Sequence, residues 1–449
     1  MGVAVWALIT YIAVIIVWNT VLKRNIGEAM VLGFVVVCAF GGAGVLPLAW
    51  AGIADAATEE VVFAALAFVF MGHLLTQLGL IERQVTLLNA LFGRVRGGAG
   101  YVSTAASALL GGASGSGSGI AASVGSVTIP WMTRSKWRPD LAASLVAGNA
   151  GLGISIPPSS SLFLLLGSAA VAPVLTADQM LVGAFAGGLW TVLYRFLVVF
   201  VWVRRHRIER VAPEGILPLR TAWRQSWSSL LVYIGIAIPV FLTVDTGQNL
   251  LAKWIGEDAA GEISIVVWIP VLMIIGTILV AWRRLPRTGS EWNSLLAAMA
   301  PKYAVIGATL FFAFAAAASL GELGLVDDLS GIMDNIHAPA VVIAAIVGVL
   351  IVIISAPLTG TATIAAVGGV SFSALTAAGV PPVAAAVSIL IFASTEGASP
   401  PGAAPIYIAS GIANVDPARM FIRLILWFVI PILVIGVLVA TGLLPLFAA

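Results

Sequence analysis

Long apolar segments constrain the fold of this 449-residue chain more than any other feature. The apolar residues gather again and again into runs of about 17 to 25, the length that a helix needs to cross about 30 Å of hydrocarbon. The composition agrees, because 60% of the residues are hydrophobic and only 9% are charged, too few for the surface of a water-soluble globule. The sequence therefore predicts an all-α polytopic membrane protein.

The opening segment, MGVAVWALITYIAVIIVW, has no basic n-region and no small-residue cleavage site. We expect it to be a first transmembrane helix and not a signal peptide. The single cysteine, Cys38, lies within an apolar run. One cysteine excludes an internal disulfide and a cysteine cluster for metal, so redox chemistry is not expected.

Charged residues are distributed unevenly between the connecting segments. The acidic connections lie near residues 55–60, 245–262 and 322–334. Nineteen of the 22 Lys and Arg residues lie in six other segments: 23–24, 83–96, 134–138, 204–224, 283–287 and 419–423. Because basic loops of membrane proteins stay in the cytoplasm, these six segments are predicted to be cytoplasmic and the acidic ones external.

Threading the chain on this rule gives ten crossings and two re-entrant hairpins. The hairpins are 98–131 and 338–378, and each is followed by a segment that crosses once, 140–172 and 382–412. Each hairpin could instead be two complete crossings, which would preserve the sidedness. However, 98–131 has about 34 residues, fewer than the roughly 40 that two spans need. The other predicted crossings lie near 4–21, 29–50, 61–81, 180–203, 226–244, 263–282, 302–319 and 420–443.

The two hairpin segments belong to an internal repeat. GSGSGIAASVG at 115–125 resembles TGTATIAAVGG at 359–369; Ile120 precedes Pro157 by 37 residues, and Ile364 precedes Pro400 by 36. The loop charges predict that the chain enters the first hairpin from the cytoplasm and the second from outside, so the two halves are inverted. Inverted repeats with interrupted helices are typical of secondary transporters, with the binding site at their interface.

We interpret the chain as four regions on this basis. Residues 1–82 are N-terminal scaffold helices, and 83–203 are the first inverted repeat with its hairpin and broken helix. Residues 204–300 hold a cytoplasmic loop and central scaffold helices, and 301–449 are the second inverted repeat.

The repeats also predict where ligands bind, because non-helical backbone at membrane depth is tolerated only where protein or a water-filled cavity satisfies it. Each Pro-Pro pair removes two amide donors, which leaves carbonyls unpaired and exposes a helix N-terminus that attracts anions. Small residues in membrane helices usually only allow close packing. Two clusters at equivalent places, each followed at a matched distance by Pro-Pro, favour a functional reading.

Two sets of candidate residues follow. Hydroxyl and carbonyl oxygens at the hairpin tips suit Na⁺, a hard cation. The predicted sodium ligands are Ser114, Ser116, Gly117, Gly360, Thr361 and Thr363. The predicted substrate-binding residues flank the two Pro-Pro breaks: Pro157, Pro158, Ser159, Ser160, Glu396, Ser399, Pro400 and Gly402.

These residues resemble a known family, the large permease subunit (DctM-like) of tripartite ATP-independent periplasmic (TRAP) transporters, within the ion transporter superfamily. The likeness is strongest from Phe68 to about Gly183, and it includes FVFMGHLLTQLGLIERQVTLLNALFGRVRGG, IPWM at 129–132 and GISIPPSS at 153–160. The Ser-Pro-Pro-Gly of 399–402 and the ending from Ile406 to Pro445 resemble the second half.

The resemblance implies sodium-coupled import of a small carboxylate, of the C4-dicarboxylate or sugar-acid type, across the bacterial inner membrane. It implies two partners, a soluble periplasmic substrate-binding protein and a small four-helix membrane subunit. Na⁺ is the implied coupling ion, and no organic cofactor and no nucleic acid are expected. The family pattern puts sodium ligands at the hairpin tips, which carries over to Ser116, Thr361 and Thr363.

The chain departs from the family pattern at the second hairpin. Where the family often has an acidic residue, this chain reads PLTGTAT, and Glu396 instead lies four residues before Pro400. An ionisable side chain within a membrane segment is a functional candidate, although it could simply be paired within the bundle. Coupling to protons through Glu396 therefore stays open.

Two other readings compete with this one. Gly112-Ala113-Ser114-Gly115 looks like the nucleophile motif of rhomboid proteases, which needs a histidine on a later membrane helix. His206 and His337 fall in predicted loops and His73 precedes the motif, so we expect a transporter and not an enzyme. The alternative transporter is a self-sufficient sodium- or proton-coupled organic-anion symporter that needs no binding protein.

Overall fold

The computed structural model describes residues 2–446 apart from 59, 115–116, 169, 211–215, 244–250, 255, 257–264, 326–327, 329–338 and 357. Within these residues the regular elements are all helical. The expected fold class, an all-α polytopic membrane protein, is confirmed by this architecture.

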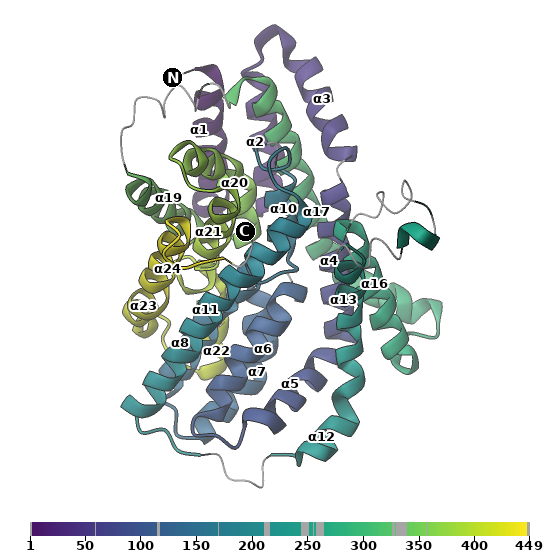
Figure 1. Ribbon diagram of the computed structural model, residues 1–449, viewed down its shortest axis with the longest axis vertical. Coiled ribbons are helices and arrows are strands. Elements are labelled where there is room, and N and C mark those ends of the chain that lie inside the picture. Colours follow the sequence, from purple (N-terminus) through teal and green to yellow (C-terminus); the bar gives the residue numbers. More distant parts are fainter. Residues whose placement is uncertain are drawn as a thin grey trace.

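Three groups of helices follow the chain (Figure 1). The helices that precede and separate the two hairpin segments, here called the scaffold, are α1 (Val3–Ile16), α2 (Ile26–Ala39), α3 (Val45–Thr58), α4 (Glu60–Gln77), α5 (Leu80–Phe92), α12 (Leu219–Ser226), α13 (Ile234–Thr243), α16 (Ile265–Val280) and α17 (Gly289–Glu322). The predicted first repeat holds α6 (Gly98–Ser114), α7 (Gly117–Arg134), α8 (Pro139–Ala150), α9 (Leu152–Ser155), α10 (Ser160–Leu166) and α11 (Ala177–Arg205). The second holds α19 (Ala340–Ser355), α20 (Gly360–Ala377), α21 (Pro382–Ala393), α22 (Ala404–Ala413), α23 (Ala418–Leu424) and α24 (Ile430–Ala440), with a short helical turn at Glu396–Ala398.

Several helices are long and apolar enough to cross a membrane. Within the described residues four qualify alone: Ala177–Arg205, Tyr303–Glu322, Gly360–Ala377 and Ala418–Ala440. The number rises to six if each of two bent helix pairs is one span. Shorter apolar helices such as α19 and α21 lie beside them, so the ten crossings and the re-entrant depth of the hairpins stay predictions.

Two sequence-based expectations are wrong in detail. The predicted crossing at 29–50 is divided, because α2 ends at Ala39 and α3 begins at Val45 after a turn that holds three glycines, the residue with the lowest helix propensity after proline. The basic segment 83–96 was expected to be a loop. It is mostly the helix α5, which leaves α4 at 69° through Gly79, where a φ of +68° favours glycine.

The two repeats interlock. Each hairpin packs on the broken helix of its own half, α6 and α7 on α8 and α9, and α19 and α20 on α21. Each hairpin also contacts the segment beyond the break of the other half: α7 packs on α22, and α20 on α10 (Figure 1). These contacts between the two halves bring both hairpin tips and both breaks into one region.

Candidate functional site

The first broken helix is interrupted at the Pro-Pro pair. The backbone leaves the helical conformation at Ile156, and Ser159 then caps α10, its Oγ accepting the N–H of Leu162 at 3.1 Å. The peptide bond between Pro157 and Pro158 is cis. Proline supplies no N–H, so the break cannot continue the hydrogen-bond ladder, and the N-terminus of α10 is left facing the interior.

The second broken helix repeats this plan. Helix α21 ends at Ala393, the turn Glu396–Ala398 follows, and α22 begins at Ala404 after a second cis Pro-Pro bond. Ser399 is buried, and its Oγ donates to the carbonyl of Thr395 at 2.9 Å. The same carbonyl also accepts the backbone N–H of Ala398 at 2.8 Å, so the turn and the hydroxyl share one acceptor.

The two breaks cross in direct contact. A Cβ at Gly151 would overlap the carbonyl of Ser394, so only glycine allows this approach. Arg195 of α11 is fully buried beside the crossing. Its Nε donates to the carbonyl of Gly148 at 3.2 Å, and its Nη2 lies 3.5 Å from the carbonyl of Ser394. One guanidinium thus bridges the ends of α8 and α21, where helix dipoles concentrate negative partial charge.

Both hairpin tips meet at Glu396. This residue is only 7% exposed, and its carboxylate accepts the backbone N–H groups of Gly117 and Gly360. Those glycines are the first residues of α7 and α20. Helix N-termini carry positive partial charge and unpaired N–H groups, so they stabilise a buried carboxylate. Glu396 therefore joins the second break to both hairpins.

Hydroxyl groups surround this junction. The Oγ of Ser161 on α10 lies 3.1 Å from the Oγ1 of Thr361 on α20, which links the first break to the second hairpin. Thr359 caps α20, and the Oγ1 of Thr363 donates to the Thr359 carbonyl at 3.0 Å. The described residues hold no group of three His, Cys, Asp or Glu side chains for a metal ion. A cation here would depend on hydroxyl and carbonyl oxygens beside the single carboxylate of Glu396.

The predicted site residues are thus only partly gathered. Gly117, Gly360, Thr361 and Glu396 lie at the junction. Ser159 and Ser160 begin α10, which packs on α20. Gly402 is exposed, and the Thr363 hydroxyl donates to the carbonyl of Thr359, which caps the same helix. Pro158 is buried, and Pro157 and Pro400 are half-buried at their breaks. Ser116 lies outside the described residues, as does His337, and the side chain of Ser114 is not described.

Sequence reasoning missed Arg195 and Ser161. An arginine within an apolar helix is a signal for a buried or functional group, and Arg195 interrupts the apolar run of α11. Ser161 gave no such signal, because serines are common in this chain and only the contact with Thr361 distinguishes it.

Two cavities lie near the two hairpins, one beside α7 and one beside α20, and both lie against α17. The larger, of about 760 Å³, lies between α4, α5, α7 and α17, and its lining includes His73, Gln77, Glu82, Gly119 and Ser123. Gly119 is two residues from the tip glycine Gly117. The smaller cavity, of about 70 Å³, lies between α1, α10, α17 and α20. One hairpin thus faces a cavity about ten times larger than the cavity beside the other hairpin.

Comparison with known proteins agrees with this architecture. A model of the tripartite ATP-independent periplasmic transporter family, DctM component, matches residues 5–446. The sialic acid TRAP transporter large permease protein SiaM of Vibrio cholerae is 23% identical over 376 residues, 83% of this chain and 82% of the relative. The isethionate TRAP transporter permease protein DctMQ of Oleidesulfovibrio alaskensis is 23% identical over 405 residues. The alignment covers 86% of this chain but only 58% of the relative.

Solved structures show the same fold. The Alcanivorax borkumensis YdaH transporter aligns with a TM-score of 0.59 at 17% identity, covering 90% of this chain and 89% of the other. Neisseria gonorrhoeae MtrF aligns with a TM-score of 0.63 at 15% identity, covering 88% and 84%. The match over nearly the whole sequence, together with the interrupted helices and apolar spans, shows that the chain is a multi-pass membrane permease that belongs to the DctM family of tripartite ATP-independent periplasmic transporters.

Proposed function

We propose that the chain uses a sodium gradient to import a small carboxylate across the bacterial inner membrane. The observation that carries the proposal is the convergence of two helix breaks and two hairpin tips beside a 760 Å³ cavity. The hydroxyls of Ser161 and Thr361 offer oxygen ligands for Na⁺, and the N-terminus of α10 offers N–H groups to an anion.

The unequal cavities support transport by alternating access. The larger cavity is lined by α17 residues from Ala298 to Val305, and the smaller by α17 residues from Ala313 to Gly321. The predicted topology puts the first on the cytoplasmic side and the second on the external side. Movement of the hairpins along α17 would open one cavity as it closes the other, with the ligands carried between them.

The substrate class rests on the relatives. Those named above are described as permeases for sialic acid and isethionate, and one from Rhodobacter capsulatus, 24% identical over 257 residues, for C4-dicarboxylate. All three are organic anions. A carboxylate substrate is consistent with the helix N-terminus at Ser159–Ser160.

We propose two partners on the same basis, a soluble periplasmic binding protein that delivers the substrate and a small membrane subunit. The relative DctMQ is longer than the region it shares with this chain, which covers 58% of its length. A self-sufficient symporter is the second candidate. The buried Glu396 carboxylate bears on the coupling ion of either candidate, because it could carry a proton in place of a sodium ion.

Uptake by reconstituted proteoliposomes tests the proposal. The chain is assayed alone and with the small subunit and candidate binding proteins, each with and without an inward sodium gradient. We expect uptake only with both partners and the gradient. Robust uptake by the chain alone would favour the self-sufficient symporter, and uptake driven by a pH gradient without sodium would refute sodium coupling.

A further inference from the structure

A third cavity lies away from the hairpins, where the C-terminal end of α11 meets α8 and α23. Its volume is about 340 Å³. It is lined by three arginines, a histidine, two tryptophans and three aliphatic residues: Arg205, Arg419, Arg423, His206, Trp202, Trp427, Leu141, Ile422 and Leu426. The lining holds no carboxylate, so this basic cavity has no anion of its own.

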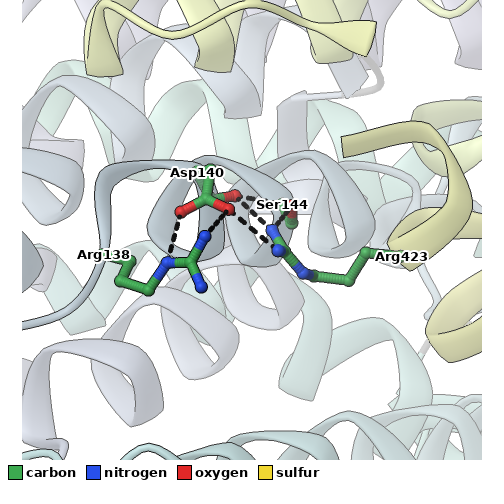
Figure 2. Close-up of polar contacts among 4 residues, drawn as sticks. All are labelled: Arg138, Asp140, Ser144 and Arg423. Carbon is green, nitrogen blue, oxygen red and sulfur yellow. Dashed lines mark hydrogen bonds and ion pairs between the residues drawn. The ribbon is translucent and has the colours of Figure 1, made fainter. Parts of the chain in front are cut away.

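The nearest carboxylate to the cavity is already shared. Figure 2 shows Asp140 between two guanidinium groups. Arg138 donates to both of its oxygens at 3.1 and 3.0 Å, and Arg423 reaches Oδ2 at 2.8 Å and the Ser144 hydroxyl at 3.1 Å. Two positive charges on one negative charge leave this cluster with an excess of one.

The remaining arginines add to that excess. Within the described part of the chain, the side chains of Arg205 and Arg419 form no hydrogen bond or ion pair. The nearby Asp416 caps Ala418 with its Oδ1 at 3.0 Å. Partial burial lowers the pKa of His206, and Arg138, Arg423 and Arg205 lower it further. The imidazole is therefore mostly neutral at pH 7, and the arginines supply the charge.

The rim of the basic cavity is apolar and exposed. Ile422 is 74% and Leu426 57% exposed, one turn apart along α23 and the helical turn that follows it. The tryptophans Trp202 and Trp427 pack edge to face at the same place, with ring centroids 5.8 Å apart. Tryptophan is typical of the membrane interface, and the basic segments here are those predicted to be cytoplasmic.

We propose that the basic cavity binds the phosphate of an anionic phospholipid of the cytoplasmic leaflet, with the acyl chains along Ile422 and Leu426. Basic cavities between membrane helices on this side suit phospholipid headgroups, and guanidinium groups bind phosphate oxygens in a fork. A soluble phosphate would match the charge of the cavity but would make no contact with the exposed aliphatic side chains of its rim.

Native mass spectrometry of the detergent-purified chain tests this assignment with dioleoyl phosphatidylglycerol and dioleoyl phosphatidylcholine as probes. The wild-type chain should retain phosphatidylglycerol in preference. Arg205→Gln and Arg419→Gln should each weaken its binding by roughly fivefold, the attraction of one basic side chain to an anionic membrane surface. Arg220→Gln is the matched control, because Arg220 is an exposed arginine of α12 that does not line the cavity.

A further variant separates lipid from soluble anion. Leu426→Ser should weaken the binding of phosphatidylglycerol but not the binding of glycerol 3-phosphate. As a control for folding, the unliganded variants should melt at the wild-type temperature. Equal retention of both lipids, equal losses in Arg220→Gln, or full displacement of phosphatidylglycerol by millimolar inorganic phosphate would overturn the proposal.

Discussion

Glu396 is the side chain on which the junction depends, because its carboxylate contacts both hairpin tips. Its carboxylate accepts N–H groups from Gly117 and Gly360 while the residue is 7% exposed. Desolvation of a carboxylate is costly, and the two helix N-termini offset that cost. The charge therefore holds the tips and the second break in one arrangement.

Glu396→Gln should disturb this arrangement without changing its shape. The amide has one acceptor oxygen and an NH₂ group that cannot accept, so one tip N–H loses its partner. Hydrogen bonds to charged groups contribute about 1.5–3 kcal/mol, so we expect uptake to fall by roughly ten- to 150-fold. Initial rates of uptake measure this, with Glu322→Gln, an exposed carboxylate at the end of α17, as the control.

The same variant distinguishes the coupling ions. If sodium drives transport, the residual uptake of Glu396→Gln keeps its dependence on the sodium gradient. If Glu396 carries a proton, uptake driven by a pH gradient is lost in the variant. Unchanged rates under both gradients would show that the carboxylate has no part in coupling.

Arg195 is a second single side chain whose role can be tested, here by its effect on the stability of the fold. Its guanidinium bridges the carbonyls of Gly148 and Ser394, so Arg195→Gln leaves at least one of them unpaired in a buried site. An unpaired buried polar group costs about 1–3 kcal/mol of unfolding free energy. We therefore expect the melting temperature to fall by the amount that corresponds to this loss. Arg195→Lys keeps the charge but not the fork and should be intermediate.

Thermal unfolding of the purified chain measures the effect. Arg204→Lys, on an exposed position of the same helix, is the control and should melt as the wild type does. If Arg195→Gln melts at the wild-type temperature as well, the guanidinium does not brace the two breaks.

Among the elements, the broken helices were the most predictable. Pro-Pro within an apolar run forbids a continuous helix, and both helices break there. The kink at Gly79 and the turn after Ala39 were not predicted, since single glycines are also common inside membrane helices. The contacts among Glu396, Gly117 and Gly360 link residues far apart in sequence, and nothing in one sequence pairs them. The hydroxyl contact between Ser161 and Thr361 was missed for the same reason.

The hairpin tips give a prediction about ion binding. Thr361→Ala and Ser116→Ala should each raise the sodium concentration for half-maximal uptake, because an oxygen ligand or its orientation is lost. The expected cost is about 1–3 kcal/mol, or roughly five- to 150-fold in affinity. Thr361→Ala also removes the partner of Ser161.

Ser103→Ala is the matched control for both variants. Ser103 is buried on α6, away from the tip, and its hydroxyl has no partner among the described residues. Sodium titrations of uptake should leave this variant unchanged. Wild-type sodium affinity in both tip variants would exclude their hydroxyls from the ion site.

At the scale of the whole molecule, the proposed transport needs two cavities that open in turn to opposite faces of the membrane. The cavity beside α7 is about 760 Å³ and the one beside α20 about 70 Å³, and both lie against α17. The charge of the loops predicts that the first faces the cytoplasm. The predicted inverted repeats would account for the arrangement, because exchange of the conformations of the two hairpins would exchange the two cavities.

Cysteine labelling tests this claim most directly, in a Cys38→Ala background with either Ser123→Cys in the larger cavity or Ser373→Cys in the smaller one. A membrane-impermeant maleimide is added to sealed vesicles of either orientation, with and without sodium and the loaded binding protein. We predict that Ser123→Cys is labelled only from the cytoplasmic face, that Ser373→Cys is labelled slowly and only from the external face, and that transport conditions shift the two rates in opposite directions. Labelling of both positions from one face, or rates that rise and fall together, would contradict alternating access between the two hairpins.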